Sequence, residues 1–411
     1  MGAPFAIAPA APPCFIAAEH HLSIPLAMLL VFGSAKLLAE LFERAGQPGI
    51  VGEILAGIVI GPSVFGWIAP NELLHALSEL GVMFLLFRVG LEVKPSELVQ
   101  VGGTALMVAV LGVALPFVLG WAIMAAWGYP RVESIFVGAA MVATSVGITA
   151  QVLAAKGLLQ LRASRIILGA AVIDDILGLL VLAIVSGFAT GRVNVLDITL
   201  TATAALGTTA LVATLGTRTM RRIVPRLSQS LRAGEVQFNV ALVLLFALAL
   251  LATYARMAAI IGAFLAGMAL AESVSTRVND LSAGVAELLV PFFLVGIGLQ
   301  VDLGAVASPS LMILAAAVLI AAVASKWIGC GIAAAPLGWT EAMRIGVGMV
   351  PRGEVGMVVA QIGLSMGVIE KSVYGVVVFM AVATTLIAPP LLKMFYRGVR
   401  PIAVEERFQI G

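Results

Sequence analysis

Apolar runs separated by short polar turns follow one another along almost the whole chain. Each run is bounded by charged residues or by turns that contain Gly or Pro, and thirteen runs can be marked. They lie near residues 22–45, 49–66, 72–92, 98–127, 133–156, 163–189, 196–220, 236–254, 257–272, 284–303, 309–335, 340–366 and 370–397. Several are close to the ~20 residues with which a helix crosses a ~30 Å hydrocarbon core. The pattern therefore predicts an all-α polytopic membrane protein with about 13 transmembrane helices.

The composition supports this prediction and excludes several kinds of site. The chain has 411 residues, of which 61% are hydrophobic and 11% are charged, whereas a soluble protein has about 25% charged residues. The two cysteines, Cys14 and Cys330, lie far apart in the sequence. The three histidines, His20, His21 and His75, fall near predicted helix ends. We therefore expect no disulfide framework, no resident metal site or other cofactor, and no nucleic-acid partner.

The Lys and Arg residues between the predicted helices gather on one side of the membrane. Sixteen lie in one set of loops together with the C-terminal tail, whereas the other set holds four, Arg131, Arg192, Arg256 and Lys371. Because cytoplasmic loops carry the excess of positive charge, we expect the C-terminus in the cytoplasm and the N-terminus outside the cell (inner) membrane. The first 21 residues lack the basic start of a signal peptide, so we expect an extracytoplasmic tail there.

The sequence contains an internal repeat. "IVGEILAGIVIGPS" from residue 50 aligns with "IIGAFLAGMALAES" from residue 260, and "ELGVMFLLFRVGLEV" from residue 79 aligns with "ELLVPFFLVGIGLQV" from residue 287. The offset is 208 to 210 residues in both cases, which indicates one duplication. The matches pair helices that are seven apart, and because seven is odd, paired helices cross the membrane in opposite directions. This is the inverted-topology repeat of secondary transporters.

The repeat divides the chain into five parts. We expect an N-terminal tail at 1–21, a first repeat of helices 1–6 at 22–189, a connecting helix 7 with a basic cytoplasmic loop at 190–235, a second repeat of helices 8–13 at 236–397, and a cytoplasmic tail at 398–411. Substrate sites of such transporters lie near the midplane, where the two repeats meet.

Two corresponding segments are predicted to be broken helices. "MVATSVGITAQ" from residue 141 aligns with "MVPRGEVGMVVAQ" from residue 349, and the centre of each is rich in residues that loosen helical hydrogen bonding, such as Thr144, Ser145 and Pro351. We expect both helices to break at mid-membrane and to cross in opposite senses. Broken segments at that depth line a cavity or lie buried in protein, and their half-helix ends present partial charges to an ion.

Two adjacent carboxylates, Asp174 and Asp175, lie about eleven residues into the predicted helix 163–189, or ~17 Å along it, close to the midplane. Charges at this depth are costly and mark ion pathways. Neighbouring side chains on a helix diverge by about 100°, so we expect one carboxylate to face an ion cavity and the other a protein partner. The best candidate for that partner is Lys326. The repeat places Thr384 and Thr385 at the corresponding positions.

These groups provide the minimal chemistry of an antiporter. Desolvation disfavours a charged carboxylate, so a cation and a proton compete for it, while a Lys–Asp pair that a cation disrupts can release a proton. A salt bridge of Lys326 that never titrates is the competing interpretation.

The polar residues of the two breaks also have alternative roles. Thr144 and Ser145 either bind the ion or satisfy freed backbone groups. For Arg352 and Glu354 we favour compensation of the half-helix dipoles.

Several segments resemble a known family. "VIDDILGLLVLA", "MVATSVGITAQVL", "GEILAGIVIGPSVFG", "ELGVMFLLFRVGLEV" and "VPRGEVGMVVAQIG" are similar to the monovalent cation:proton antiporter-2 family, most closely its NapA-type Na+/H+ antiporters. The likeness runs from about residue 24 to 397. It implies a NhaA/NapA-like fold and a homodimer in which a core domain, helices 4–6 and 11–13, moves against a dimerisation domain.

The resemblance also assigns roles to residues. It makes Asp175 the Na+-binding aspartate and pairs Asp174 with Lys326, and it places Thr144 and Ser145 near the ion. The double-Asp form implies electrogenic exchange of two protons for one Na+. Potassium-efflux relatives carry a cytoplasmic nucleotide-binding domain after the last helix, whereas this chain ends fourteen residues beyond residue 397, so we expect no gating by such a domain in the same chain.

The leading hypothesis is a transporter, not an enzyme, that exchanges Na+ or Li+ for H+ by alternating access. The nearest alternative is a K+/H+ antiporter on the same scaffold, and a sodium-coupled symporter of an organic anion ranks below it. An intramembrane aspartyl protease needs two aspartates from different helices that share a proton, whereas these are neighbours on one helix. A passive channel is disfavoured because paired broken helices around one site suit alternating access.

Overall fold

The computed structural model describes residues 23–93, 95–190, 195–230, 235–255, 257–302, 304 and 308–399. The first half contains α1 (Ile24–Arg44), α2 (Gly49–Ile60), α3 (Glu72–Glu92), α4 (Pro95–Ala126), α5 (Arg131–Ala140), α6 (Val146–Ala155), α7 (Arg162–Thr190), α8 (Val195–Leu211), the π-helical turn η1 (Val212–Gly216) and α9 (Thr217–Ser230). The second half contains α10 (Val236–Tyr254), α11 (Ala259–Leu270), α12 (Thr276–Leu299), α13 (Pro309–Ala334), the 3-10 turn η3 (Ala335–Leu337), α14 (Trp339–Gly348), α15 (Glu354–Ser365) and α16 (Lys371–Phe395). The tails at residues 1–22 and 400–411 lie outside the described residues.

The predicted fold class is confirmed. Every regular element in the described ranges is a helix, and eight of these helices are long and apolar enough to cross a membrane. Shorter apolar helices, among them α2, α6 and α11, lie between them. Helices prevail because a chain in hydrocarbon must satisfy its backbone hydrogen bonds within each segment. The total of thirteen spans stays a prediction.

Polar side chains cap the starts of α3 and α13. Asn71 precedes α3, and its side-chain oxygen accepts a hydrogen bond from the Leu74 N–H at 2.9 Å. Ser308 precedes α13, and its hydroxyl accepts from the Leu311 N–H at 3.3 Å. Each cap satisfies one of the N–H groups that lack a partner in the first helical turn.

The structure extends one predicted run. The run at 196–220 continues through η1 into α9, which ends at Ser230 and packs against α10 and α11. Val224 on α9 is buried, whereas Arg218, Arg222 and Arg226 are exposed. Because this helix is amphipathic and rich in arginine, hydrophobicity alone did not reveal it.

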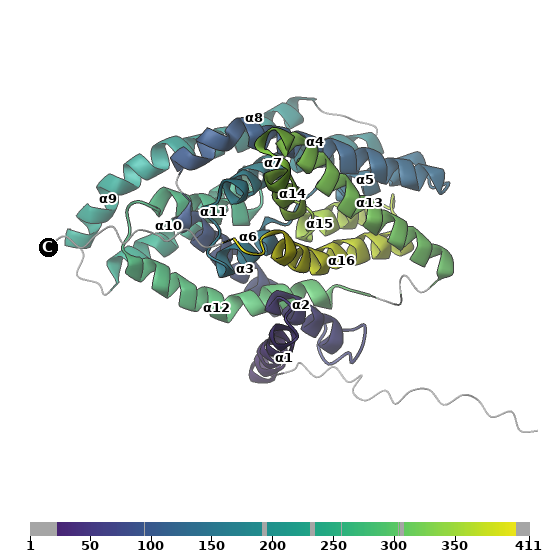
Figure 1. Ribbon diagram of the computed structural model, residues 1–411, viewed down its shortest axis with the longest axis horizontal. Helices are drawn as coiled ribbons and strands as arrows, with labels where there is room; N and C mark the ends of the chain where they lie inside the picture. The colour runs from purple at the N-terminus through teal and green to yellow at the C-terminus, as the bar shows by residue number, and fades with distance from the viewer. Residues whose placement is uncertain are drawn as a thin grey trace, which may run out of the picture.

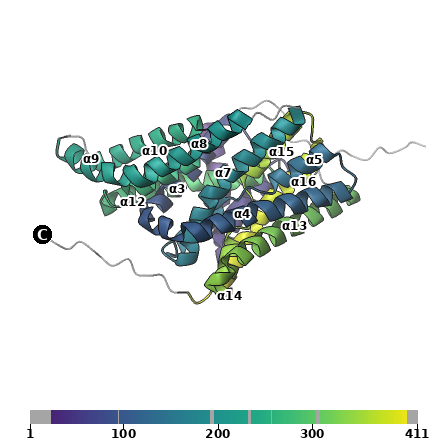
Figure 2. The ribbon, with the colours of Figure 1, turned by 90° about the horizontal axis from the view of Figure 1, so that it is seen from above.

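The helices pack in two groups (Figure 1). In one, α4 packs against α5, α7 and α13, and α13 packs against α14 and α16. In the other, α3 packs against α11 and α12, α2 against α1 and α12, and α10 against α11. Figure 2 shows α4 beside α13 on one side of the molecule and α8, α9 and α10 on the other. The assignment of these groups to a moving core and a dimerisation domain stays a prediction.

Pairs of glycines allow close crossings in the second group. A Cβ built on Gly57 of α2 would lie 2.9 Å from the Cα of Gly298 on α12, and one built on Gly90 of α3 would lie 3.1 Å from the Cα of Gly267 on α11. Gly57 aligns with Gly267 in the repeat, and Gly90 aligns with Gly298. The same crossing thus occurs twice between aligned residues, which supports the duplication; its inverted orientation stays a prediction.

We expect Gly57→Ala to destabilise the protein. The added Cβ would lie 2.1 Å from the carbonyl oxygen of Val295, so the two helices must move apart. Overpacking of this kind lowers the free energy of unfolding by about 1–3 kcal/mol, which thermal unfolding of the detergent-solubilised protein measures. Gly284→Ala on α12 is the matched control, because no neighbouring atom lies within 4 Å of its new Cβ. Equal melting temperatures for the two variants would contradict the crossing.

Candidate ion-binding site

Both segments predicted to be broken are broken. Residues 141–145 separate α5 from α6, and residues 349–353 separate α14 from α15. Pro351, in the second break, lacks a backbone N–H. It therefore cannot donate the hydrogen bond to the carbonyl four residues earlier that would continue α14. Each break leaves helix ends with unpaired backbone groups in the interior of the protein.

The two breaks contact each other. The backbone N–H of Ser145 donates to the carbonyl of Pro351 at 2.8 Å, and the hydroxyl of Thr149 donates to the carbonyl of Gly348 at 2.7 Å. A Cβ on Gly353 would lie 2.6 Å from the Cβ of Ser145, so this approach requires glycine. The crossing therefore satisfies some of the backbone groups that the breaks release.

Asp174 and Lys326 form an ion pair sealed from solvent. The Nζ of Lys326 on α13 donates to Oδ1 of Asp174 on α7 at 2.9 Å, and both side chains are 0% exposed. The second oxygen, Oδ2, is buried without a hydrogen-bond partner in the described part of the chain. Removing two charges from water is costly, and the pair recovers this cost only through their mutual attraction. Removing either partner therefore leaves an uncompensated buried charge.

Asp175 faces a different neighbourhood. It is 6% exposed and lines a small cavity of about 10 Å³. The other lining residues come from α3, α6, α7 and α11: Leu86, Val146, Leu168, Val172, Ile261 and Phe264. This volume is about that of one water-sized sphere, so a single small ion or water fills it. The cavity lies where α7, of the first group of helices, meets α3 and α11 of the second.

The first break adjoins this cavity. Val146, which follows Ser145 directly, is one of the cavity's lining residues. The hydroxyl of Thr144 is buried, and it has no hydrogen-bond partner among the described residues. The first break thus contains one uncommitted hydroxyl, two residues before the cavity-lining Val146, whereas the Ser145 backbone N–H already donates to the Pro351 carbonyl. Ion ligation by Thr144 and Ser145 stays a prediction.

Arg352 lies buried in the second break. Its backbone N–H donates to the hydroxyl of Thr384 at 3.1 Å, and its carbonyl accepts from the hydroxyl of Thr385 at 2.6 Å. Its Nη2 donates to the carbonyl of Ala322 on α13 at 3.2 Å, whereas Nε and Nη1 have no hydrogen-bond partner among the described residues. The two threonines that align with the aspartate pair thus hold a broken segment. Glu354 begins α15, but its side chain lies outside the described part of the structure.

The sequence analysis missed a further charged pair. The Nζ of Lys36 on α1 lies 2.8 Å from Oε1 of Glu53 on α2, and the Glu53 side chain is only 8% exposed. Both line a cavity of about 590 Å³ to which Lys156 and Lys393 also contribute. These two lysines belong to the loops predicted to be cytoplasmic, so we expect the cavity to open on that side. The available signals were Lys36 and Glu53 themselves, two charges inside the predicted spans 22–45 and 49–66.

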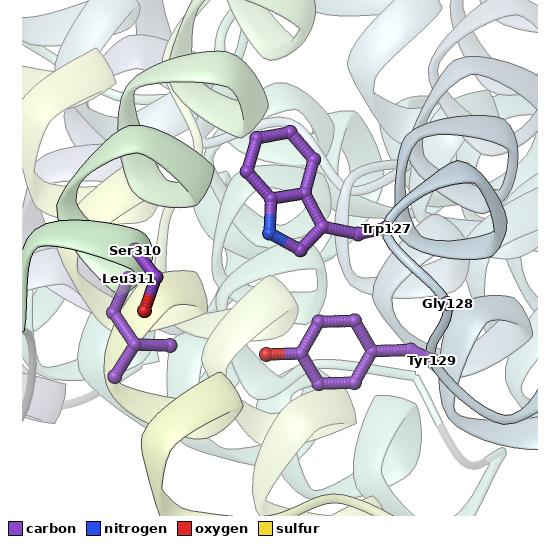
Figure 3. A pocket seen from close by; sticks show the side chains of 5 residues that line it. All are labelled: Trp127, Gly128, Tyr129, Ser310 and Leu311. Carbon is purple, nitrogen blue, oxygen red and sulfur yellow. The ribbon is translucent and has the colours of Figure 1, made fainter.

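A third cavity, of about 210 Å³ (Figure 3), lies at the end of α4 that is predicted to be extracytoplasmic. Trp127, Gly128 and Tyr129 from the α4–α5 turn and Ser310 and Leu311 at the start of α13 line it. Its lining residues carry no carboxylate or amine. Neither Asp174 nor Asp175 lines this cavity.

Comparisons with known proteins identify relatives along almost the whole chain. The family model described as "Sodium/hydrogen exchanger, transmembrane" matches residues 28–398. The Na+/H+-K+ antiporter GerN of Bacillus cereus is 36% identical over 383 residues, which are 91% of this chain and 96% of GerN. The high-affinity Na+/H+ antiporter NhaS3 of Synechocystis sp. is 32% identical over 428 residues, with 93% of this chain and 92% of NhaS3 covered. The sodium proton antiporter MjNhaP1 of Methanocaldococcus jannaschii shares the fold, with a TM-score of 0.65 and 16% identity over 90% of this chain and 96% of MjNhaP1.

We expect Lys326→Ala to lower the free energy of unfolding by about 3–5 kcal/mol, because Asp174 is left buried without its partner. Thermal unfolding in detergent at neutral pH measures the loss. Arg44→Ala is the control: its pair with Glu40 is 2.7 Å long but 75% and 55% exposed, so its removal should cost less than about 1 kcal/mol. Equal losses in the two variants would show that the Asp174–Lys326 pair is not sealed from water.

Proposed function

The chain belongs to the sodium/hydrogen exchanger family, and we propose that it exchanges Na+ for H+ across the membrane by alternating access. The family match confirms the relationship to monovalent cation:proton antiporters that the motifs predicted. Two relatives at 36% and 32% identity, each aligned over more than nine tenths of this chain, are named as Na+/H+ antiporters.

One observation carries the proposal: two neighbouring aspartates at mid-helix have separate environments. Asp174 is bound to Lys326, while Asp175 lines a cavity beside the first helix break. A carboxylate in such a cavity is a single site for which Na+ and H+ compete. The two ligands exclude each other, so the site carries either Na+ or protons. If it crosses the membrane only when it is loaded, it carries Na+ in one direction and protons in the other, which is exchange.

The breaks complete the proposed ion site. Carbonyl and hydroxyl oxygens are suitable ligands for a hard cation, and Thr144 offers an uncommitted hydroxyl two residues before Val146, which lines the Asp175 cavity. We propose that Thr144 and Ser145 help to bind Na+. Arg352 and Glu354 compensate the partial charges of the half-helix ends at the second break.

The location of Asp175 suggests how the site changes sides. Its cavity lies between the two groups of helices, so movement of one group against the other exposes Asp175 alternately to either side. We propose that α4–α7 and α13–α16 form the moving core, and that the remaining helices form the scaffold of a homodimer. The protein acts in the cell membrane, with its N-terminus outside, and needs no cofactor.

The second aspartate suggests electrogenic exchange. When Na+ binds at Asp175, it displaces the Asp175 proton, and its positive charge weakens the hold of the neighbouring Asp174 on the Lys326 ammonium, so Lys326 also releases a proton. Both protons leave to the side from which Na+ entered. On the return step, Asp175 and Lys326 each carry a proton. Two protons then cross for each Na+, with one net charge per cycle.

A K+/H+ exchanger is the second candidate, because GerN, at 36% identity, is named an Na+/H+-K+ antiporter. The same carboxylate chemistry serves K+. The two candidates differ only in the size and number of oxygens around the ion. A sodium-coupled symporter of an organic anion would instead show solute uptake that rises with Na+, without counterflow of protons.

We expect Asp175→Asn to abolish exchange, because an amide neither holds a proton nor attracts a cation as a carboxylate does. Purified protein in liposomes that contain a pH dye should respond to Na+ no more than empty liposomes. Asp280→Asn, on the exposed start of α12, should transport as the unaltered protein does. Normal transport and pH dependence in Asp175→Asn would place the ion site elsewhere.

A survey of cations in liposomes at clamped membrane potential tests both which cation is transported and how much net charge moves per cycle. We expect Na+ pulses to dissipate a pH gradient, K+ pulses to have a smaller effect, and the apparent KM for Na+ to rise in proportion to the proton concentration in the acidic range. On a solid-supported membrane each Na+ pulse should give a transient current. Equal responses to K+ and Na+ would favour the K+/H+ assignment, and exchange without current would exclude the two-proton cycle.

A further inference from the structure

The Lys326 side chain passes α4 on its way to Asp174. Lys326 lies on α13 and Asp174 on α7, and α4 packs against both of these helices. Figure 2 shows α4 running beside α13. Gly112 of α4 faces the Lys326 side chain.

Gly112 leaves the space that the lysine occupies. A Cβ built there would lie 3.3 Å from Nζ of Lys326, 3.6 Å from its Cδ, and 2.8 Å from Sγ of Cys330. The first distance is tighter than an ordinary carbon–nitrogen contact, and the last is a clash. Any side chain at position 112 must therefore displace both neighbours.

The surroundings offer Lys326 little alternative space. Cys330, one turn after Lys326, is fully buried, and its thiol donates to the carbonyl of Val108 on α4 at 3.5 Å. The titratable groups around the ammonium are Asp174 from α7, Arg352 from the second break, and Cys330 from its own helix. Glycine is a poor helix former, so its place inside α4 needs a reason, and close helix approach is the usual one in membranes.

We propose that Gly112 is a positioning residue that sets how closely Lys326 approaches Asp174 and thereby sets the pH dependence of exchange. It touches neither cation nor proton and acts through the lysine. In a medium of low dielectric the attraction between two charges changes steeply with distance, so a displacement of a few tenths of an ångström alters the release of the proton from the pair. This inference rests on the proposed role of Lys326 in Na+/H+ exchange.

Four variants separate the positioning of Lys326 from helix packing. Gly112→Ala introduces both contacts, and Cys330→Ala removes the sulfur. The double variant Gly112→Ala/Cys330→Ala relieves the clash with Sγ but keeps the new methyl 3.3 Å from Nζ. Gly329→Ala is the matched control: its Cβ would lie 3.0 Å from the carbonyl of Leu111, at the same crossing of α4 and α13, and no atom of Lys326 is among its nearest neighbours.

The readouts are the melting temperature in detergent and the pH profile of Na+-driven proton flux in liposomes, with Lys326→Ala as reference. We expect the double variant to have the same melting temperature as Cys330→Ala. Its pH profile, however, should shift by about half a pH unit toward that of Lys326→Ala. Gly329→Ala should have a lower melting temperature than the unaltered protein but the same pH profile.

Two results would overturn the proposal, and they are distinguishable. If Lys326→Ala shifts the profile and the double variant does not, Gly112 only packs helices, and the proposed function stands. If Lys326→Ala itself keeps the unaltered profile, Lys326 has no part in proton coupling, and its role in the proposed cycle fails together with that of Gly112.

Discussion

The fold around the site depends on one buried ion pair, Asp174 with Lys326, whose charged atoms are 2.9 Å apart and inaccessible to water. Two charges at this depth are tolerable only together, so the helices that carry them are held in register across α4. Gly112 provides the space for the lysine, and Cys330 fixes α13 to α4 one turn further along. The adjacent Asp175 then projects to the other side of α7, toward α3 and α11, because neighbouring residues on a helix cannot share one direction.

The two halves of the chain use the same framework for different purposes. In the second half, Thr384 and Thr385 bind the backbone of Arg352 and so hold a broken segment in place. In the first half, the aligned positions carry Asp174 and Asp175. Hydroxyl groups suit a structural role because they donate and accept without charge, whereas carboxylates attract cations and exchange protons. The proposed ion site thus lies in the half of the repeat that carries the acidic pair.

Much of this architecture could be predicted from the sequence, because the membrane restricts the alternatives. Hydrocarbon forces the backbone into helices, so apolar runs and their breaks at Thr144 and Pro351 were readable directly. The partners of Asp174 and Asp175 followed in part from the helical angle between them. The helix α9 was not predicted because it is amphipathic and rich in arginine, so no apolar run marks it. The Lys36–Glu53 pair and the contact of Gly112 with Lys326 were not predicted because each depends on contacts between different helices. A glycine that accommodates a lysine has no pattern of its own along the chain.

The hydrogen bonding of the buried cluster argues for a pair that changes state. Asp174 Oδ2 has no hydrogen-bond partner in the described structure, nor have Nε and Nη1 of Arg352. A purely structural ion pair is most stable when every buried donor and acceptor is satisfied, because each unsatisfied group retains its desolvation cost. Here one anion lies among two buried cations, and each side keeps unused hydrogen-bonding capacity. Such a cluster can lose or gain a proton with less rearrangement than a fully satisfied network, because the groups that need new partners already lie nearby.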